Sequence, residues 1–253
     1  MITLGIDVGG SGVKGAPVDL STGELTSPTL LFPTPRPATP EAVTEAVVKI
    51  VDGFADSHGD APVGVTLPGV IRAGVMRTAA NLDESFVGCD IHALVEDRVG
   101  RPVTVLNDAD AAGIGEERYG AARGVGGTVL VVTLGTGIGT ALLVDGVLVP
   151  NIEFGHMEID GHDAETRAAA SVRDREQLGW VQYAERLQRF LTEIEKLFNP
   201  DLIVVGGGVS ANADHFLPLL RLDAPIVPAT LHNKAGIVGA AAFAVTAAPV
   251  VSS

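Results

Sequence analysis

The chain has 253 residues, 46% of them hydrophobic and 19% charged, so it is long enough for one large or two modest domains and is not intrinsically disordered as a whole. Its 17 Lys and Arg against 31 Asp and Glu leave a net charge of −14, which argues against nucleic acid or an anionic membrane as a general partner. A single cysteine, a start without a signal-peptide pattern and no apolar run of membrane-spanning length predict a cytoplasmic protein without internal disulfides.

The first predicted element is a β-hairpin. Residues 2–8 alternate apolar and other side chains at a period of two, residues 9–12 turn the chain through three glycines, and residues 13–20 form a returning strand. The 31 glycines of the chain exceed the usual share of about 7%, and they cluster at such turns.

The rest of the chain alternates helices and strands, which predicts an α/β fold. Thr39 precedes a proline and apolar residues at helical spacing, which predicts a helix up to about residue 54, and Asp90 caps a second helix over 91–99. The other predicted elements are strands at 63–67 and 103–106, a helix at 109–119, strands at 128–134 and 140–148, a helical stretch at 164–198 broken near Gly179 and closed by Pro200, a strand at 202–205, a helix at 212–220, a strand at 226–227, a helix at 235–245 and a frayed tail at 247–253.

The hairpin recurs later in the chain. Residues 4–19 align without gaps on residues 130–145, with the glycine turn of one copy on that of the other. The identity is low enough to arise by chance, but both copies run strand, glycine turn, strand and acidic end. A duplicated domain would form a cleft between its halves, where ligands commonly bind.

Residues 10–15 match the G-x-G-x-x-G pattern of dinucleotide-binding folds, but that fold requires a helix at this point. Val13 and Val18 favour a strand and Pro17 would disrupt a helix, so this interpretation is rejected. Two interpretations remain for the glycine turns. They are plain tight hairpins, or their backbone amides bind phosphate oxygens. The residues concerned are Gly9, Gly10, Ser11 and Gly12 in the first turn, and Gly135, Thr136, Gly137 and Gly139 in the second.

Two charged residues flank the first turn. The carboxylate of Asp7 is placed to hold a hydrated Mg²⁺ ion that bridges phosphates, or it only caps the turn. Lys14 is the one cation of this hairpin, and it is either a phosphate ligand or a solvated strand residue.

A second group of polar residues lies where a predicted strand passes into a helix. Asn107 and Asp108 occupy that junction, and Asp108 can accept a proton from a substrate hydroxyl. The alternative is helix capping, and we expect either Asp108 or Asp110 to be the N-cap.

Residues 151–165 contain seven Asp, Glu and His residues and no Lys or Arg. Sugar hydroxyls would supply the missing hydrogen-bond donors, since carboxylates orient neutral polyols by accepting from them. A zinc site that uses His156 and His162, or a merely solvated acidic loop, are the competing interpretations.

Taken together, these motifs resemble the ROK family of sugar kinases and repressors, which has the actin-like ATPase (ribonuclease H-like) fold with two similar domains and a cleft between them. The resemblance implies a small domain at 1–106 plus 236–253, a large domain at 107–235, and Asp108 as the catalytic base on the 6-hydroxyl of a hexose. It also implies sugar ligands at Asn81, Asn107, Asp108, Glu153, His156 and Glu165, and a nucleoside-side segment at Gly206, Gly207 and Gly208. The motifs are residues 7–14, 107–109, 134–139, 153–156 and 205–208.

One departure and one closer similarity refine the expectation. The cysteine-rich zinc motif typical of the family is missing, so no structural zinc is expected. Residues 155–165 are similar to those of the bacterial polyphosphate glucokinases within the family, which implies polyphosphate and also ATP as phosphoryl donors, with Mg²⁺. Polyphosphate requires local cations on so acidic a chain, and the candidates near predicted cleft loops are Lys14, Arg72, Arg77 and Lys234.

The sequence therefore predicts a cytoplasmic, homodimeric glucokinase that phosphorylates the 6-hydroxyl of glucose. One alternative is a strictly ATP-dependent kinase of glucose, mannose or an amino sugar. The other is a sugar-sensing repressor, which fits poorly because the first strand begins at residue 2 and leaves no room for a helix-turn-helix.

Overall fold

The computed structural model describes residues 1–247, so the predicted fraying of the tail falls outside the described residues except at residue 247. The chain folds into two compact units. Unit 1 is Met1–Gly115 with Lys234–Ser253, and unit 2 is Glu116–Asn233. Residues 107–115 thus group with unit 1, whereas the sequence places the start of the second domain at 107. Over residues 1–247, no helix is long and apolar enough to cross a membrane.

Unit 1 is built on a six-stranded sheet. β1 (Ile2–Val8) and β2 (Gly12–Asp19) form the predicted antiparallel hairpin, while β5 (Val63–Leu67) and β8 (Val103–Asn107) extend the sheet in parallel. The strand order is β3-β2-β1-β5-β8, with β4 also beside β2. The other elements are β3 (Glu24–Leu25), β4 (Leu30–Pro33), α1 (Pro40–Gly53), α2 (Ala55–His58), β6 (Ile71–Arg72), β7 (Val75–Met76), η1 (Glu84–Phe86), α3 (Ile91–Val99), the start of α4 (Asp108–Tyr119) and α9 (Ala235–Ala247).

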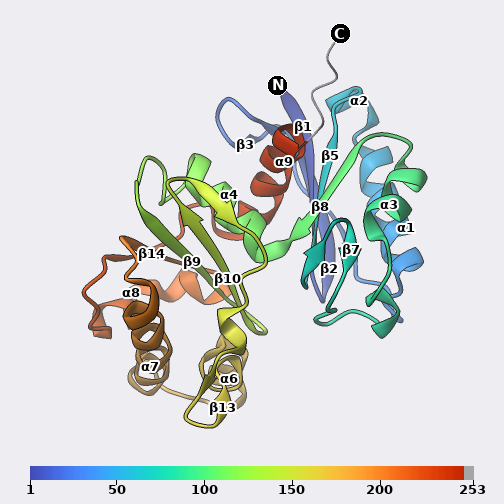
Figure 1. The fold of residues 1–253 in the computed structure, drawn as a ribbon. Coiled ribbons are helices and arrows are strands. Elements are labelled where there is room, and N and C mark those ends of the chain that lie inside the picture. The colour runs from blue at the N-terminus through green and yellow to red at the C-terminus, as the bar shows by residue number, and fades with distance from the viewer. Residues whose placement is uncertain (248–253) are drawn as a thin grey trace. The chain divides into compact units, whose positions relative to one another are not determined.

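Helices cover both faces of this sheet, with α1 and α3 on one face and α9 on the other (Figure 1). Gly5 in β1 and Gly64 in β5 allow α9 to approach closely, because a Cβ at either position would overlap the backbone carbonyl of Ile237 or Ala240. The sheet is therefore buried between two layers, as its nearly continuous apolar strands indicate.

Unit 2 repeats this plan with a five-stranded sheet in the order β11-β10-β9-β14-β15. β9 (Thr128–Leu134) and β10 (Ile138–Val144) form the antiparallel hairpin, and β14 (Leu202–Gly206) and β15 (Ile226–Pro228) follow in parallel. The other elements are the end of α4, β11 (Val147–Val149), η2 (Phe154–His156), β12 (Glu158–Ile159), β13 (His162–Asp163), α5 (Glu165–Ala168), α6 (Ala170–Arg175), α7 (Trp180–Phe198), η3 (Gly208–Asn212), α8 (Ala213–Phe216), η4 (Leu217–Leu219) and η5 (His232–Lys234).

The core of unit 2 follows from the period of two in β9. Leu130 and Val132 pack on one face with buried residues of α7 such as Leu187, and Val129 and Val131 pack on the opposite face. Both faces of the strand are buried, so its sequence is apolar without interruption.

The two sheets confirm the duplication that the sequence predicts. In each, a hairpin is followed by two parallel strands in the same order. The gapless alignment fails by one residue after the turns, however. Val8 pairs with Val13 in unit 1, whereas Leu134 pairs with Ile138 in unit 2, so the second turn is one residue shorter.

Two predicted elements are interrupted in the structure. The strand expected over 140–148 is divided into β10 and β11, because Asp145 and Gly146 both adopt positive φ and turn the chain. The helical stretch expected over 164–198 contains a further break at Ala169, whose extended backbone separates α5 from α6.

Two further elements also differ from expectation. The helix expected over 212–220 is only the short α8 flanked by 3₁₀ turns, and Pro218 removes a backbone donor there. β4 was not predicted, because it is a four-residue edge strand without a distinct pattern.

Candidate functional site

The first glycine turn joins β1 to β2, and other segments hold its carbonyl groups. The hydroxyl of Thr34 donates to the Gly9 carbonyl at 2.6 Å, and Nη2 of Arg36 donates to the Gly10 carbonyl at 2.9 Å. The amide of Thr34 donates to the Ser11 carbonyl at 3.3 Å. Within residues 1–247, the amides of Gly10 and Ser11 donate no hydrogen bond. Successive backbone amides of this kind form an anion-binding concavity.

Asp7 is the last residue but one of β1, beside this turn, and both of its carboxylate oxygens have partners. Thr66 in β5 donates its hydroxyl to Oδ1 at 2.8 Å, and Nζ of Lys14 lies 3.1 Å from Oδ2. Asp7 and Lys14 are opposite each other in the β1–β2 register, which places their side chains on one face. Gly236 leaves room for the carboxylate, since a Cβ there would lie 3.0 Å from its Cγ. The two predicted charged residues therefore form an ion pair.

Asn107 ends β8, and its side chain caps α4. Its Oδ1 accepts from the amides of Ala109 at 2.8 Å and Asp110 at 3.0 Å, and its Nδ2 donates to the Gly69 carbonyl at 3.1 Å. The expectation that Asp108 or Asp110 is the N-cap is therefore wrong, because Asn107 reaches the free amides of the first turn. Asp108 is partly exposed, and its Oδ1 accepts from the adjacent amide of Ala109 at 2.9 Å.

Asn81 lies next to the first turn. It is exposed and adopts a positive φ of 61°, and its Cβ would lie 3.0 Å from a Cβ at Gly10. The other cations predicted to serve a phosphate chain, Arg72, Arg77 and Lys234, are all exposed side chains of unit 1.

The second glycine turn joins β9 to β10 and is held by the start of α6. Ser171 donates its amide to the Gly135 carbonyl at 3.0 Å and its hydroxyl to the Thr136 carbonyl at 2.6 Å. A short helix thus fixes the carbonyls of this turn, as Thr34 and Arg36 fix those of the first.

Both turns share one construction. The first glycine of each closes it with a backbone hydrogen bond, from Gly9 to Gly12 at 2.9 Å and from Gly135 to Gly137 at 3.0 Å. In each turn, a hydroxyl from a distant segment, that of Thr34 or Ser171, then donates a hydrogen bond to a carbonyl group of the turn. A hairpin that only reverses the chain does not need a hydroxyl from a distant segment to hold its carbonyl groups. The construction that both turns share therefore favours the interpretation that they bind phosphate.

Two glycines around the second turn are closely approached by other groups. Glu165 accepts from the Ile138 amide at 3.1 Å, and a Cβ at Gly137 would overlap its Oε2. Gly207 has φ 79°, and a Cβ there would overlap the backbone of Leu134. The turn after β14 thus lies against the second hairpin. The other predicted glycines are Gly139 within β10, Gly206 at the end of β14 and Gly208 at the start of η3.

The acidic segment after β11 is tied to β10. Thr140 donates its hydroxyl to the Ile152 carbonyl at 2.7 Å and accepts from the Phe154 amide at 3.1 Å. These bonds hold Glu153 from both sides. Gly155 lies against β10, because a Cβ there would overlap the Ile138 carbonyl.

Two of the predicted sugar ligands of unit 2, His156 and Glu165, are joined through Asp163. Nδ1 of His156 lies 2.9 Å from Oδ2 of Asp163, and Oδ1 of Asp163 accepts from the Glu165 amide at 3.1 Å. The hydrogen bond to Asp163 raises the pKa of His156, with further support from Glu165. Burial raises the pKa of the Glu153 carboxyl, the charge of Glu165 adds to this rise, and His156 opposes it.

The positions of these side chains leave only one of the two predicted histidines as a candidate zinc ligand in the cluster. His156, Asp163 and Glu165 each place a ligand atom within 4.8 Å of the others. His162 instead meets Nη2 of Arg167 at 3.0 Å through its Nε2. The pairing of His156 with Asp163 accounts for this cluster without an ion, and the expected absence of structural zinc stays a prediction.

Sequence reasoning missed three residues that position the glycine turns and Asp7: Thr34, Thr66 and Ser171. Thr66 could have been found as the polar residue inside an otherwise apolar strand. Thr34 and Ser171 act across 25 and 35 residues, respectively, and no local pattern marks such contacts.

Comparison with known proteins gives concordant results. The ROK family model matches residues 3–171. A polyphosphate glucokinase of Mycobacterium tuberculosis (strain ATCC 25618 / H37Rv) is 48% identical over 239 residues, which cover 94% of this chain and 89% of the relative. An inorganic polyphosphate/ATP-glucomannokinase from Arthrobacter sp. strain KM superposes with a TM-score of 0.92 at 55% identity, over 97% of this chain and 98% of its own. A ROK family glucokinase from Streptomyces griseus, in complex with glucose and AMPPNP, has a TM-score of 0.85 at 26% identity, over 97% and 100% of the two chains.

Proposed function

The chain belongs to the ROK family, and we propose that it is a glucokinase that transfers a phosphoryl group from inorganic polyphosphate, and also from ATP, to the 6-hydroxyl of glucose. The observation that carries this proposal is the 48% identity to a polyphosphate glucokinase over 94% of the chain. The 55% identity to a polyphosphate/ATP-glucomannokinase supports the use of both donors.

Asp108 is the general base in this proposal. Its carboxylate takes the proton of the 6-hydroxyl while that oxygen forms a bond to the terminal phosphorus and the bond to the leaving phosphate oxygen breaks. The products are glucose 6-phosphate and a donor shortened by one phosphoryl group. Asn107 holds the junction of β8 and α4 rigidly, so Asp108 is presented on a fixed helix start. Positioning of this kind matters more than an elevated pKa when the transition state is loose.

Glu153, His156 and Glu165 orient the sugar, together with Asn81 and Asn107. The partly buried carboxylate of Glu153 accepts from sugar hydroxyls, and the ring of His156 donates to them through Nε2. Both polar atoms of Asn107 already bond to protein groups, so its contribution to the sugar uses the remaining lone pair of Oδ1 or the second Nδ2 proton.

The two glycine turns take the donor phosphates through their amides, with Gly207 and Gly208 beside the second turn. Asp7 fits a hydrated Mg²⁺ ion, because each of its oxygens retains an acceptor site beyond Thr66 and Lys14. A Mg²⁺ ion held there would neutralise negative charge on the donor phosphates. Action in the cytoplasm as a homodimer stays a prediction.

The test is glucose 6-phosphate formation by the purified protein with Mg²⁺, with polyphosphate and ATP offered separately and each freed of the other. Turnover with both supports the proposal. Turnover with ATP alone would favour the strictly ATP-dependent alternative, and mannose and amino sugars are then tested as acceptors. Absence of turnover with either donor would contradict the assignment.

A further inference from the structure

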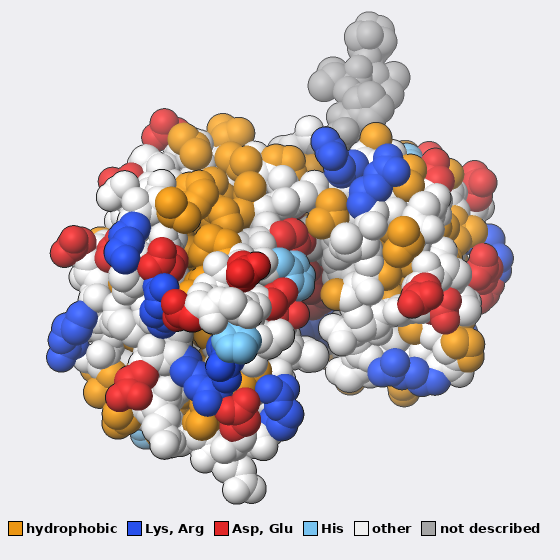
Figure 2. Space-filling model, turned by 60° about the horizontal axis from the view of Figure 1, so that its bottom comes forward, with side chains coloured by type: hydrophobic (Ala, Val, Ile, Leu, Met, Phe, Trp, Pro, Cys, Tyr) orange, Lys and Arg blue, Asp and Glu red, His pale blue; other side chains and the backbone are white. Residues whose placement is uncertain are grey.

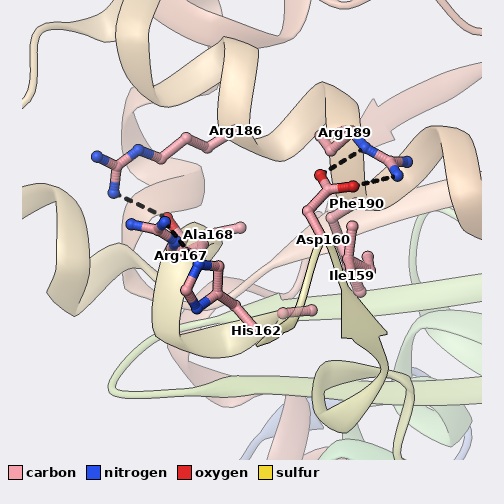
Figure 3. A pocket seen from close by; sticks show the side chains of 9 residues that line it. Ile159, Asp160, His162, Arg167, Ala168, Arg186, Arg189 and Phe190 are labelled. Carbon is pink, nitrogen blue, oxygen red and sulfur yellow. Dashed lines mark hydrogen bonds and ion pairs between the residues drawn. The ribbon is translucent and has the colours of Figure 1, made fainter.

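Unit 2 contains a cavity of about 330 Å³ that is separate from the residues assigned above. Ile159, Ala164, Ala168 and Phe190 give it apolar walls, and charged side chains surround them (Figure 3). The volume lies within the range of small-molecule sites, which are mostly apolar with a few polar groups.

The charged groups gather at two ends of this cavity. At one end, Arg189 is bidentate to Asp160, with Nε and Nη2 each 2.9 Å from a carboxylate oxygen, and this end is neutralised. At the other end lie Arg167, Arg186 and His162 (Figure 3).

The cationic end retains unused donors. Arg167 has no carboxylate partner within residues 1–247, and its Nη2 meets only Nε2 of His162 at 3.0 Å. Arg186 donates through Nη2 to Glu176 at 2.7 Å and through Nη1 to the Arg167 carbonyl at 3.4 Å. A guanidinium carries five N–H donors, so both arginines can bind a further acceptor. The side chain of Arg167 is exposed and that of Arg186 is partly buried, so an anion in solution can reach both guanidinium groups.

The segment around the cavity is more basic than the chain as a whole. Residues 167–196 carry six of the 17 Lys and Arg and five of the 31 Asp and Glu. Figure 2 shows Lys and Arg side chains gathered around a histidine on this face of the molecule. Long-range attraction of an anion is opposed by the net charge of −14, so an anion here would be bound by direct contacts.

The cavity is connected to the second glycine turn through α5 and α6. Arg167 lies in α5, two residues after Glu165, which holds the Ile138 amide, and four residues before Ser171, which holds the turn carbonyls. An anion on Arg167 therefore lies on the same short segment that supports the turn.

We propose that this cavity binds a phosphate group through Arg167 and Arg186, as an anion site distinct from the two glycine turns. Guanidinium groups suit this ligand because their paired N–H groups match two phosphate oxygens. The phosphate comes either from an inner unit of a polyphosphate chain or from a free phosphate compound, and the experiment below distinguishes the two sources.

The first arm measures binding of tripolyphosphate and of inorganic phosphate by isothermal titration calorimetry, without glucose. Arg167→Gln and Arg186→Gln are compared with Lys196→Gln, which removes the same charge from an exposed side chain of α7 outside the cavity. We expect one binding equivalent to weaken at least about tenfold in each arginine variant and to stay within about twofold in the lysine variant. Equal affinities in all three variants would overturn the proposal. Emission of Trp180 verifies that unit 2 is folded.

The second arm measures KM for long-chain polyphosphate and for ATP, and it rests on the proposed function. A rise in KM for polyphosphate alone assigns the site to the inner units of that chain. Weakened binding without any change in KM assigns it to a free phosphate compound. If the wild-type protein shows no turnover, the proposed function fails while the binding arm still decides the anion site.

Discussion

Asp108 illustrates how a single residue becomes available for chemistry. Asn107 takes over the capping of α4 and bonds to the Gly69 carbonyl, so the helix start does not require the Asp108 side chain. Asp108 is left partly exposed at the first position of a rigid helix.

Replacement of Asp108 by Asn tests this role. Because Asn cannot accept the hydroxyl proton, we expect kcat to fall by about 10²- to 10⁴-fold while KM for glucose changes by less than about tenfold. The control is Asp97→Asn, an exposed residue of α3. Steady-state kinetics with both donors provide the measurement, and a variant that retains most of its activity would remove Asp108 as the base.

Glu153 predicts a pH dependence of glucose binding. Burial and Glu165 raise the pKa of Glu153, so its carboxylate becomes protonated at a higher pH than an ordinary glutamate would. A protonated carboxyl loses acceptor capacity, and KM for glucose should therefore rise as pH falls through that pKa. Glu153→Gln should raise KM and abolish this acidic rise in profiles between about pH 4 and pH 8. The same acidic rise in the variant would assign it to another group.

The sign of the linked stability effect provides a control. A raised carboxyl pKa means that the folded state disfavours the charge, so stability is lost as pH rises through the folded pKa. Glu153→Gln should therefore match the wild type in acid and gain in relative stability towards neutral pH. The unfolding midpoint in urea, read from Trp180, measures this difference.

At the scale of elements, the second glycine turn depends on neighbours that are remote in sequence. Ser171 at the start of α6 donates hydrogen bonds to the carbonyl groups of this turn, and Gly207 after β14 lies directly against Leu134 at the end of β9. Packing of these elements, and not the hairpin alone, thus fixes the turn.

Gly207 and Gly208 provide a matched pair of substitutions. Gly207→Ala places a Cβ at φ 79° against backbone atoms of Leu134, and we expect a loss of at least about 2 kcal/mol of stability. A Cβ at Gly208 meets nothing within 4 Å, so Gly208→Ala should change stability by less than about 1 kcal/mol. Urea unfolding followed by Trp180 emission reports on unit 2 alone, and equal losses would refute the argument.

At the scale of the whole molecule, the chain passes between its two units twice, at residues 115–116 and 233–234. The proposed ligands of glucose are distributed over both units. Asn81, Asn107 and Asp108 belong to unit 1, and Glu153, His156 and Glu165 to unit 2.

The chain carries one probe in each unit to test that distribution, because its single cysteine, Cys89, lies in unit 1 and its single tryptophan, Trp180, lies in unit 2. Glucose at about 100 times its Kd should raise the free energy of unfolding of each unit that binds it by about 2.7 kcal/mol. We expect glucose to slow thiol labelling of Cys89 in moderate urea and to raise the urea midpoint of Trp180 emission. Protection of Trp180 alone would remove the unit 1 residues from the sugar site, and galactose serves as the control sugar.

Sequence alone determined the hairpins, α1 with its Thr39 cap, the parallel strands and the repeated plan, because these depend on local periodicity, glycine turns and caps. The motif residues also sufficed to identify the ROK family. Only the tertiary structure decided that Asn107 caps α4, that Lys14 pairs with Asp7, that the helical stretch breaks at Ala169, and that Arg167 and Arg186 meet at a cavity. These features join residues distant in the chain or depend on competition between neighbouring donors and acceptors. A local sequence pattern does not show which of several nearby polar side chains forms the hydrogen bond to a given backbone amide in the folded protein.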